Sequence, residues 1–255
     1  MKIEGSVALV TGANRGIGEI FVRELLRRGA KKVYAGARDI ASLGAVVTND
    51  RRIVPLEVDV TNPDQVDGAV ATAQDLTLLI NNAGMAGWQG VLSAPDVKIA
   101  RDEMEVNYFG VLLMSRAFAP ILAANGGGAI VNILSMLSLV TLPAAGTYSA
   151  SKAAALALTR SLRAELKHRG TAVIATLPVQ VETAMGQPLP EPRLKPEEVV
   201  LDTLDGVERG TAEVFPGALT RNVAEAFEAS PKAVQAQLSE MLPAMGGSVA
   251  NSGFL

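Results

Sequence analysis

Short runs of apolar residues alternate along the chain with segments whose apolar positions recur every three or four residues. An uninterrupted apolar run is typical of a strand buried on both faces, whereas the longer spacing is typical of a helix with one buried face. The first pair is the run 7–10 and the helical segment 19–28, which ends before Gly29. The expected strands are 7–10, 32–37, 53–58, 76–80, 129–134, 172–177 and 211–215, and the expected helices are 19–28, 66–74, 96–124, 151–169 and 197–208.

Regular alternation of strands and helices is typical of a parallel sheet that carries helices on both faces. We therefore expect an α/β protein with a single Rossmann-fold domain over residues 1–255, built on a doubly wound parallel sheet of seven strands. Two segments have looser patterns. Residues 184–196 follow a strand and are either a flap over a substrate or an ordinary surface loop, and the tail 243–255 is expected to be flexible.

Composition excludes several function classes. A formal charge of -3 and a pI near 5.4 argue against a nucleic-acid partner. The chain has no cysteine and His168 is its single histidine, so we expect neither a disulfide nor a metal site. The N-terminal residues do not resemble a signal peptide, and no stretch reaches the roughly 20 apolar residues that cross a bilayer. These features predict a cytoplasmic protein that does not bind a membrane.

A glycine-rich loop, TGANRGIG at 11–18, joins the first expected strand to the first helix. Glycines let the backbone approach a pyrophosphate, whose charge is stabilised at the N-terminus of the helix. Strand, glycine loop, helix and strand within about 30 residues are typical of a dinucleotide-binding unit. The residues expected to contact the cofactor here are Gly12, Asn14, Arg15, Gly16, Ile17 and Gly18.

Tyr148 and Lys152 stand four residues apart beside the alanine-rich helical segment 151–169. Residues at this spacing share a helix face. The ordinary pKa of a phenol is about 10, and a neighbouring ammonium lowers it towards neutrality. Taken alone, such a pair is more often part of a half-exposed helix face than of an acid–base site.

Further motifs, which occur in a fixed order along the chain, favour the interpretation of Tyr148 and Lys152 as an acid–base site. They are TGANRGIG at 11–18, Asp59-Val60, NNAG at 81–84, Asn107, Ser135, Tyr148-x-x-x-Lys152 and the segment 178–183. Over residues 5–220 the chain resembles the short-chain dehydrogenase/reductases, and closely their single-domain carbonyl reductase and ketoreductase type. The resemblance implies an NADPH-dependent reductase of ketones or aldehydes that also works in reverse as an alcohol dehydrogenase.

The resemblance also implies a role for each catalytic residue. Tyr148 would give its proton to the carbonyl oxygen as hydride arrives from the nicotinamide, and Lys152 would lower the pKa of that phenol and bond the nicotinamide ribose. Ser135 would polarise the carbonyl, with Ser138 as a weaker candidate for substrate contact. Asn107 would kink its helix and hold a water that links Lys152 to bulk solvent.

The end of the second expected strand bears on which nicotinamide cofactor binds. Proteins that prefer NAD place an acidic side chain there, whereas this chain has Ala37 followed by Arg38, and Arg15 lies in the glycine loop. Two guanidiniums suit a 2′-phosphate, so we expect NADP(H), although Asp39 could bond the ribose of NAD. The resemblance adds the further cofactor contacts Asp59, Val60, Asn82, Ala83, Gly84, Tyr148, Lys152, Pro178, Val181 and Thr183.

The expected substrate pocket is mostly apolar, which suits a lipophilic ketone. Trp88 could instead be a core or surface residue. Val179 stands where the family usually has glycine, and it adds bulk beside the nicotinamide. In the family a Val-Asp-Gly-Gly ending often helps to build a tetramer, and it is absent here, which leaves a dimer, a monomer or a differently built tetramer open; we expect a homo-oligomer, dimer or tetramer. A non-catalytic NADP(H)-binding sensor is the alternative function. The pocket residues are Met85, Trp88, Met136, Leu137, Leu142, Val179, Gln180 and Met185.

Overall fold

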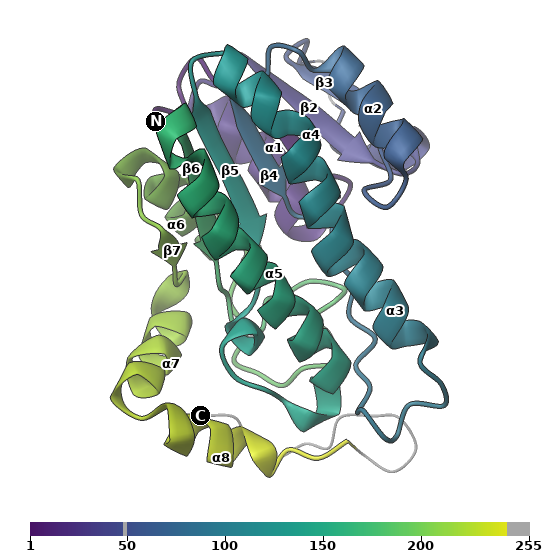
Figure 1. Cartoon of the computed structure of the whole chain (residues 1–255), viewed down its shortest axis with the longest axis vertical. Coiled ribbons are helices and arrows are strands. Elements are labelled where there is room, and N and C mark those ends of the chain that lie inside the picture. Colours follow the sequence, from purple (N-terminus) through teal and green to yellow (C-terminus); the bar gives the residue numbers. More distant parts are fainter. Residues whose placement is uncertain (48–49, 244–255) are drawn as a thin grey trace.

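The computed structural model describes residues 1–47 and 50–243, and its centre is a parallel sheet (Figure 1). The strand order is β3-β2-β1-β4-β5-β6-β7. The chain thus winds outwards in both directions from the border between β1 and β4, and ligands of such sheets bind at the carboxyl ends of the strands near that border. The expected doubly wound parallel sheet of seven strands is confirmed. The strands are β1 Val7–Thr11, β2 Lys32–Ala37, β3 Ile53–Glu57, β4 Leu78–Asn81, β5 Gly128–Ile133, β6 Thr171–Thr176 and β7 Glu213–Val214.

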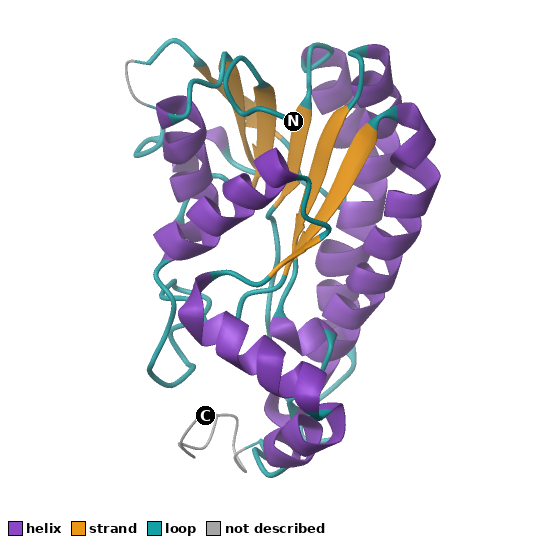
Figure 2. Ribbon diagram, turned by 90° about the vertical axis from the view of Figure 1, so that its left-hand side faces the viewer, coloured by secondary structure: helices purple, strands orange, loops and turns teal. Residues whose placement is uncertain are grey.

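Helices cover both faces of the sheet (Figure 2). On one face α1 (Gly16–Arg27) packs against α6 (Pro196–Arg209), and on the other α2 (Pro63–Thr72), α4 (Val111–Ala124) and α5 (Gly146–Leu166) lie side by side. The remaining helices are α3 (Lys98–Met104), α7 (Gly217–Ala229) and α8 (Pro231–Ser239), with 3-10 turns at Ile40–Leu43, Met136–Ser138, Pro143–Ala145 and Lys167–Arg169.

Burial on both faces explains the continuous apolar runs of the strands. In β1, Ala8 and Val10 belong to the core beneath α1 and α6, whereas Val7 and Leu9 belong to the core beneath α2 and α4. Successive strand side chains point to opposite faces, so each face needs apolar residues in alternate positions. Full burial of one such side chain contributes roughly 1.5–3 kcal/mol.

The C-terminal part of the fold differs from the expectation. Helix α5 begins at Gly146, five residues before the expected start at 151, so Tyr148 lies in its first turn. Helices α7 and α8 were not expected at all. The tail expected to be flexible lies outside the described residues, apart from residue 243.

The expected helix 96–124 is one long helix with an interruption. A π turn, Glu105–Gly110, separates α3 from α4. By length and composition alone, Lys98–Ala124 could cross a membrane. However, α4 covers the sheet, and 44% of the most apolar stretch of Lys98–Ala124 is buried inside the fold. A buried core helix has the same composition, so the helix is explained by its place on the sheet.

Candidate active site

The sequence motifs follow the carboxyl ends of four neighbouring strands. The glycine loop follows β1, NNAG begins in β4, Ser135 lies just beyond β5 and Pro178 just beyond β6. Carboxyl ends of parallel strands meet at one edge of the sheet, so the fold brings these segments together.

The glycine loop fits a phosphate group. Gly12 and Gly16 have φ angles of +63° and +55°, which favour glycine, and a Cβ on Gly18 would lie 2.1 Å from the carbonyl oxygen of Gly12. Arg15 stands at the N-terminal end of α1 and no side chain caps the first amides of this helix. A pyrophosphate would bind those amides and gain from the helix dipole.

Two arginines flank the place expected for the adenosine ribose. Arg15 and Arg38 are both exposed, and within residues 1–47 and 50–243 neither makes an ion pair. The carboxylate of Asp39 accepts a hydrogen bond from the backbone N–H of Ala41 at 2.9 Å, where it caps the turn Ile40–Leu43. The acidic side chain that could bond an NAD ribose is therefore engaged in its own turn.

Asn82 has a structural task that its motif did not reveal. Its Nδ2 donates to the carbonyl oxygens of Thr11 at 2.9 Å and Gly12 at 3.2 Å, and the Thr11 hydroxyl in turn accepts from the amides of Asn82 and Ala83. The Asn82 carboxamide thus fastens the end of β4 to the glycine loop. The Nδ2 of Asn82 is therefore engaged within the protein and is not free for the expected adenine ribose.

The other expected cofactor residues surround the same edge. Asp59 accepts hydrogen bonds from the amide and hydroxyl of Thr61, and Val60 is buried beside Gly110. Pro178 accepts from the amide of Met136, and Val181 pairs with Leu194. Thr183 lies against the glycine loop, since a Cβ on Gly16 would be 3.3 Å from its methyl carbon.

Tyr148 is buried, with 7% of its surface exposed, and it hydrogen-bonds with the hydroxyl of Ser135. Burial raises the pKa of the phenol well above its ordinary value, the Ser135 hydrogen bond lowers it in part, and the negative charge of Glu103 raises it further. The residue is therefore a neutral proton donor over the whole physiological range.

Lys152 is buried beside it. Its ammonium donates a hydrogen bond to the carbonyl oxygen of Ile133 at 3.0 Å and lies 5.7 Å from the centroid of the Tyr148 ring. Burial lowers the pKa of Lys152 to about 8. Burial is the largest influence on the pKa of both groups. The expectation that Lys152 lowers the pKa of Tyr148 stays a prediction.

Asn107 lies in the π turn and faces the same point. Its Nδ2 donates to the carbonyl oxygen of Met85 and to the Ser151 hydroxyl, both at 2.9 Å, and its Oδ1 accepts from the amide of Met85 at 3.0 Å. A Cβ on Gly84 would lie 3.2 Å from Asn107 Oδ1 and 3.6 Å from Lys152 Nζ. The carboxamide and the ammonium therefore converge on one small residue, which explains the glycine there.

Ser138 lies one turn beyond Ser135. Its buried hydroxyl has no hydrogen-bond partner among the described residues, whereas the Ser135 oxygen also accepts from the amide of Leu137 at 3.1 Å. Ser135 is thus the serine joined to Tyr148. Ser138 stays a weaker candidate for substrate contact.

The expected pocket residues separate into two groups. Trp88, Leu137 and Leu142 pack around Tyr148, and the carbonyl oxygen of Met185 accepts a hydrogen bond from Trp88. The second group has other contacts: Met136 and Val179 belong to the core beneath β6, and the Gln180 side chain donates to the carbonyl oxygen of Pro192. The backbone of Met85 binds Asn107.

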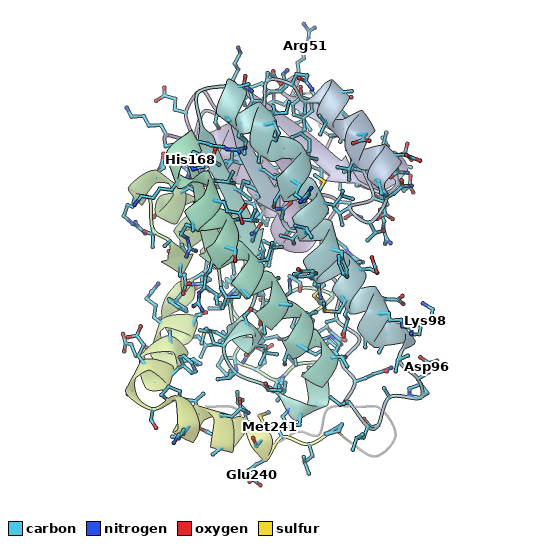
Figure 3. All side chains as sticks on the ribbon, viewed as in Figure 1. Arg51, Asp96, Lys98, His168, Glu240 and Met241 are labelled. Carbon is cyan, nitrogen blue, oxygen red and sulfur yellow. The ribbon has the colours of Figure 1, made fainter. Side chains whose placement is uncertain are left out.

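Helix α8 supplies residues that the sequence reasoning missed. Val234 and Leu238 of α8, and Met241 just beyond it, pack on the Tyr148 cluster. Met241 lies at this end of the molecule (Figure 3). Ser230 caps α8 and Pro231 is its first residue, so this signature and the four-residue spacing of Val234 and Leu238 could have revealed the helix.

Two features of the structure concern histidine chemistry and metal binding. His168 follows the far end of α5, at the opposite end of the molecule from Met241 (Figure 3). In the described part of the chain no group of three or more His, Asp or Glu side chains is placed to hold a metal ion.

Comparison with known proteins agrees with this geometry. The family model described as short chain dehydrogenase matches residues 6–194. The chain belongs to the short-chain dehydrogenase family. Galactitol 2-dehydrogenase (L-tagatose-forming) of Cereibacter sphaeroides is 39% identical to this short-chain dehydrogenase over 195 residues, which are 72% of this chain and 74% of the relative.

Solved structures of related proteins carry different nicotinamide cofactors. A short chain dehydrogenase from Burkholderia cenocepacia J2315 in complex with NADP is 48% identical, with a TM-score of 0.89 and coverage of 93% of this chain and 99% of that one. The 3-ketoacyl-(acyl-carrier-protein) reductase from Brucella melitensis complexed with NADH is 27% identical, with a TM-score of 0.76 and coverage of 82% and 94%. This short-chain dehydrogenase is thus an oxidoreductase, and the family by itself does not decide between NAD and NADP.

Proposed function

We propose that this short-chain dehydrogenase is an NADPH-dependent reductase of lipophilic ketones or aldehydes, which also oxidises the corresponding alcohols. The observation that carries the proposal is the buried Tyr148 hydroxyl, hydrogen-bonded to Ser135 beside Lys152 and facing an apolar cluster. A general acid, a second hydroxyl for the carbonyl oxygen and a nearby cation are the groups that carbonyl reduction needs.

Each residue has a distinct part in the proposed reaction. The Ser135 hydroxyl donates a hydrogen bond to the substrate carbonyl oxygen and Tyr148 donates its proton to the same atom. The reduced nicotinamide, when bound, supplies the hydride. Lys152 stabilises the resulting phenolate, and Asn107 holds the Met85 backbone and Ser151 in place behind it.

Preference for NADP(H) rests on this chain's own residues. Arg15 and Arg38 are exposed at the cofactor edge without ion pairs in the described structure, and Asp39 caps its own turn. A guanidinium pair binds a 2′-phosphate in bidentate geometry. The NADP complex of the 48% identical relative supports the same choice.

The proposed function extends to the substrate class, the cellular location, the oligomeric state and the segment 184–196. Apolar walls formed by Trp88, Leu137 and Leu142 favour substrates without charge. We propose a cytoplasmic homo-oligomer of one Rossmann-fold domain per chain. Segment 184–196 would be the flap over the substrate.

The first experiment is an initial-rate measurement of NADPH and NADH oxidation against aryl ketones, alkyl ketones and keto esters. We expect turnover with NADPH and a large preference for it over NADH. Faster turnover with NADH would contradict the assignment of Arg15 and Arg38.

A second experiment separates a reductase from a non-catalytic sensor. Replacing Tyr148 by Phe removes the proton donor and leaves the ring packing, so turnover should fall by at least about 1,000-fold while NADPH binding, measured by fluorescence titration, is unchanged. Retained turnover in Tyr148→Phe would contradict the mechanism. Binding of NADPH without turnover of any carbonyl by the wild-type protein would favour the sensor.

A further inference from the structure

Trp88 is the single tryptophan of the chain, and it lies in the loop between β4 and α3 with a backbone φ of +50°. It is the one non-glycine residue with positive φ among the described residues. A bulky residue adopts this conformation only where its surroundings compensate for the strain. The contacts of Trp88 therefore show what the strain accomplishes.

The side of the loop that faces α3 is fastened immediately before Trp88. The carboxylate of Glu103 is fully buried, and its Oε1 accepts a hydrogen bond from the amide of Gly87 at 2.8 Å. A Cβ on Gly87 would lie 2.2 Å from the side chain of Ile99, so the loop is pressed onto α3. A hydrogen bond to a buried carboxylate is among the stronger ones in proteins. The loop thus has a firm anchor on α3.

The indole of Trp88 joins two further parts of the site. Its ring centroid lies 5.5 Å from that of Tyr148 at an interplanar angle of 40°. Its Nε1 donates a hydrogen bond to the carbonyl oxygen of Met185 at 3.0 Å. One side chain therefore contacts the proton donor and the segment 184–196, which we call the flap.

The flap is braced internally by Arg193. The guanidinium of Arg193 donates to the carbonyl oxygens of Gly186 at 3.3 Å and Gln187 at 3.1 Å, and it pairs with Glu191. At its base Leu194 bridges to Val181. Within the described structure, the hydrogen bond from Trp88 is the one that joins the flap to the opposite side of the pocket.

We propose that Trp88 is a latch that holds the flap over Tyr148, and that its ring forms the wall against which the larger substituent of the substrate lies. The latch needs only the Nε1–H and the carbonyl oxygen of Met185. The role of the Trp88 ring as a wall rests on the proposed carbonyl reduction, because this role places a planar, aromatic substituent beside the carbonyl that Tyr148 protonates. Offset contact between aromatic rings favours such a group over an alkyl chain of equal size.

Hydrogen exchange tests the latch without any turnover. The variants are Trp88→Phe, which keeps a ring but loses the N–H donor, and Trp88→Leu, which loses both. Leu92→Ala is the control, because Leu92 lies in the same loop and is 97% exposed. Loss of one hydrogen bond should speed exchange at the amides of Gly186 and Leu189 about fivefold in both Trp88 variants and leave Leu92→Ala like the wild type. Unchanged exchange in Trp88→Phe would overturn the latch.

Steady-state kinetics test the wall. Trp88→Phe should raise KM about fivefold through the looser flap and keep the preference for aryl over alkyl ketones, whereas Trp88→Leu should also lower that preference about fivefold. An unchanged preference in Trp88→Leu would overturn the wall. Faster flap exchange together with no carbonyl turnover by any form would keep the latch and contradict the proposed function.

The wild-type protein decides the question if both variants fail to fold, as judged by circular dichroism. Its fluorescence comes from Trp88 alone among tryptophans. A latched indole predicts slow quenching by acrylamide, with a rate constant about tenfold below that of free tryptophan in the same buffer, since the ring is packed between Tyr148 and the flap. Quenching as fast as for free tryptophan would overturn the proposal.

Discussion

Tyr148 and Lys152 show how burial sets the chemistry of single residues. Removal from water disfavours the charged form of each, so the pKa of Tyr148 rises while that of Lys152 falls to about 8. The spacing of the two residues predicted their common helix face. It could not predict these shifts, because they depend on burial by distant parts of the sequence, such as the residues of α8 and of loop 85–90 that pack on Tyr148.

Replacing Lys152 by Met should make the protein more stable at pH 7. The pKa of Lys152 is about 8 in the fold and 10.5 in the unfolded chain, so the unfolded chain binds more protons between these values and wild-type stability rises with pH across that window. The raised pKa of Tyr148 acts in the opposite direction only above its ordinary value of about 10.

We expect Lys152→Met to gain about 1–2 kcal/mol in free energy of unfolding at pH 7, after loss of the hydrogen bond to Ile133. Urea unfolding at pH 7, 8 and 9.5 measures the difference. A gain in stability between pH 8 and 9.5 that persists in the variant would show that another group produces it.

Replacing Glu103 by Gln should move the pH dependence of ketone reduction. Its charge raises the pKa of Tyr148, and reduction needs Tyr148 protonated, so removal of the charge shifts the alkaline limb of kcat to lower pH. The amide oxygen of Gln can still accept from Gly87, so the tryptophan fluorescence should not change. An unshifted alkaline limb with unaltered fluorescence would contradict the electrostatic role.

At the level of elements, helices and strands could be predicted from the sequence where the local pattern of residues is strong. The apolar run of β2 was readable from the sequence. So was the body of α2, whose start is capped by the side chain of Asn62. The first turn of α5 was not, because GTYSA carries no helix signal and its backbone is held by the packing of the preceding turn. Tertiary contacts decide such segments, and a local pattern cannot contain them.

A polar side chain of helix α8 adds to its apolar packing over the site. The carboxamide of Gln235 accepts from the amide of Thr141 at 2.8 Å and donates to its carbonyl oxygen at 2.9 Å. Gln235→Ala should lower the free energy of unfolding by about 1–2 kcal/mol and speed hydrogen exchange in α8. Lys232→Ala, at an exposed position of the same helix, is the matched control and should change neither. Equal exchange in both variants would contradict this role of Gln235.

On the scale of the whole molecule, strand order places the site. Apolar runs alternating with helices were enough to expect a parallel sheet, and the sheet places the carboxyl ends of β1, β4, β5 and β6 together. The sequence motifs therefore predicted which residues lie at that edge of the sheet. They did not reveal which distant helix covers the edge, because α8 carries no chemistry-bearing motif and packs on the Tyr148 cluster through the apolar side chains of Val234 and Leu238.

Arg28 joins the two helices on one face of the sheet. Its guanidinium bonds Glu24 of α1 at 2.8 Å and Asp205 of α6 at 2.7 Å, and its side chain is only 14% exposed. Arg28→Met should cost about 1–2 kcal/mol of stability in urea unfolding, since it leaves carboxylates short of a partner. Turnover should not change, because the pair lies away from the site.

Arg23→Met is the control for this prediction. Arg23 is 62% exposed and pairs with Glu19 one turn away, so its loss should cost at most about 0.5 kcal/mol. Equal losses in the two variants would show that the bridge between α1 and α6 adds nothing beyond a surface ion pair.

The π turn at Glu105–Gly110 has a consequence for the lengths that this chain tolerates. Each residue added to or removed from a helix rotates everything beyond it by about 100°. A one-residue deletion between 105 and 110 would restore a regular helix and turn α3 away from loop 85–90, while the neighbouring loop 91–97 could lose a residue without such a rotation. We therefore expect natural variants of this protein to conserve the length of 103–111 more strictly than its composition.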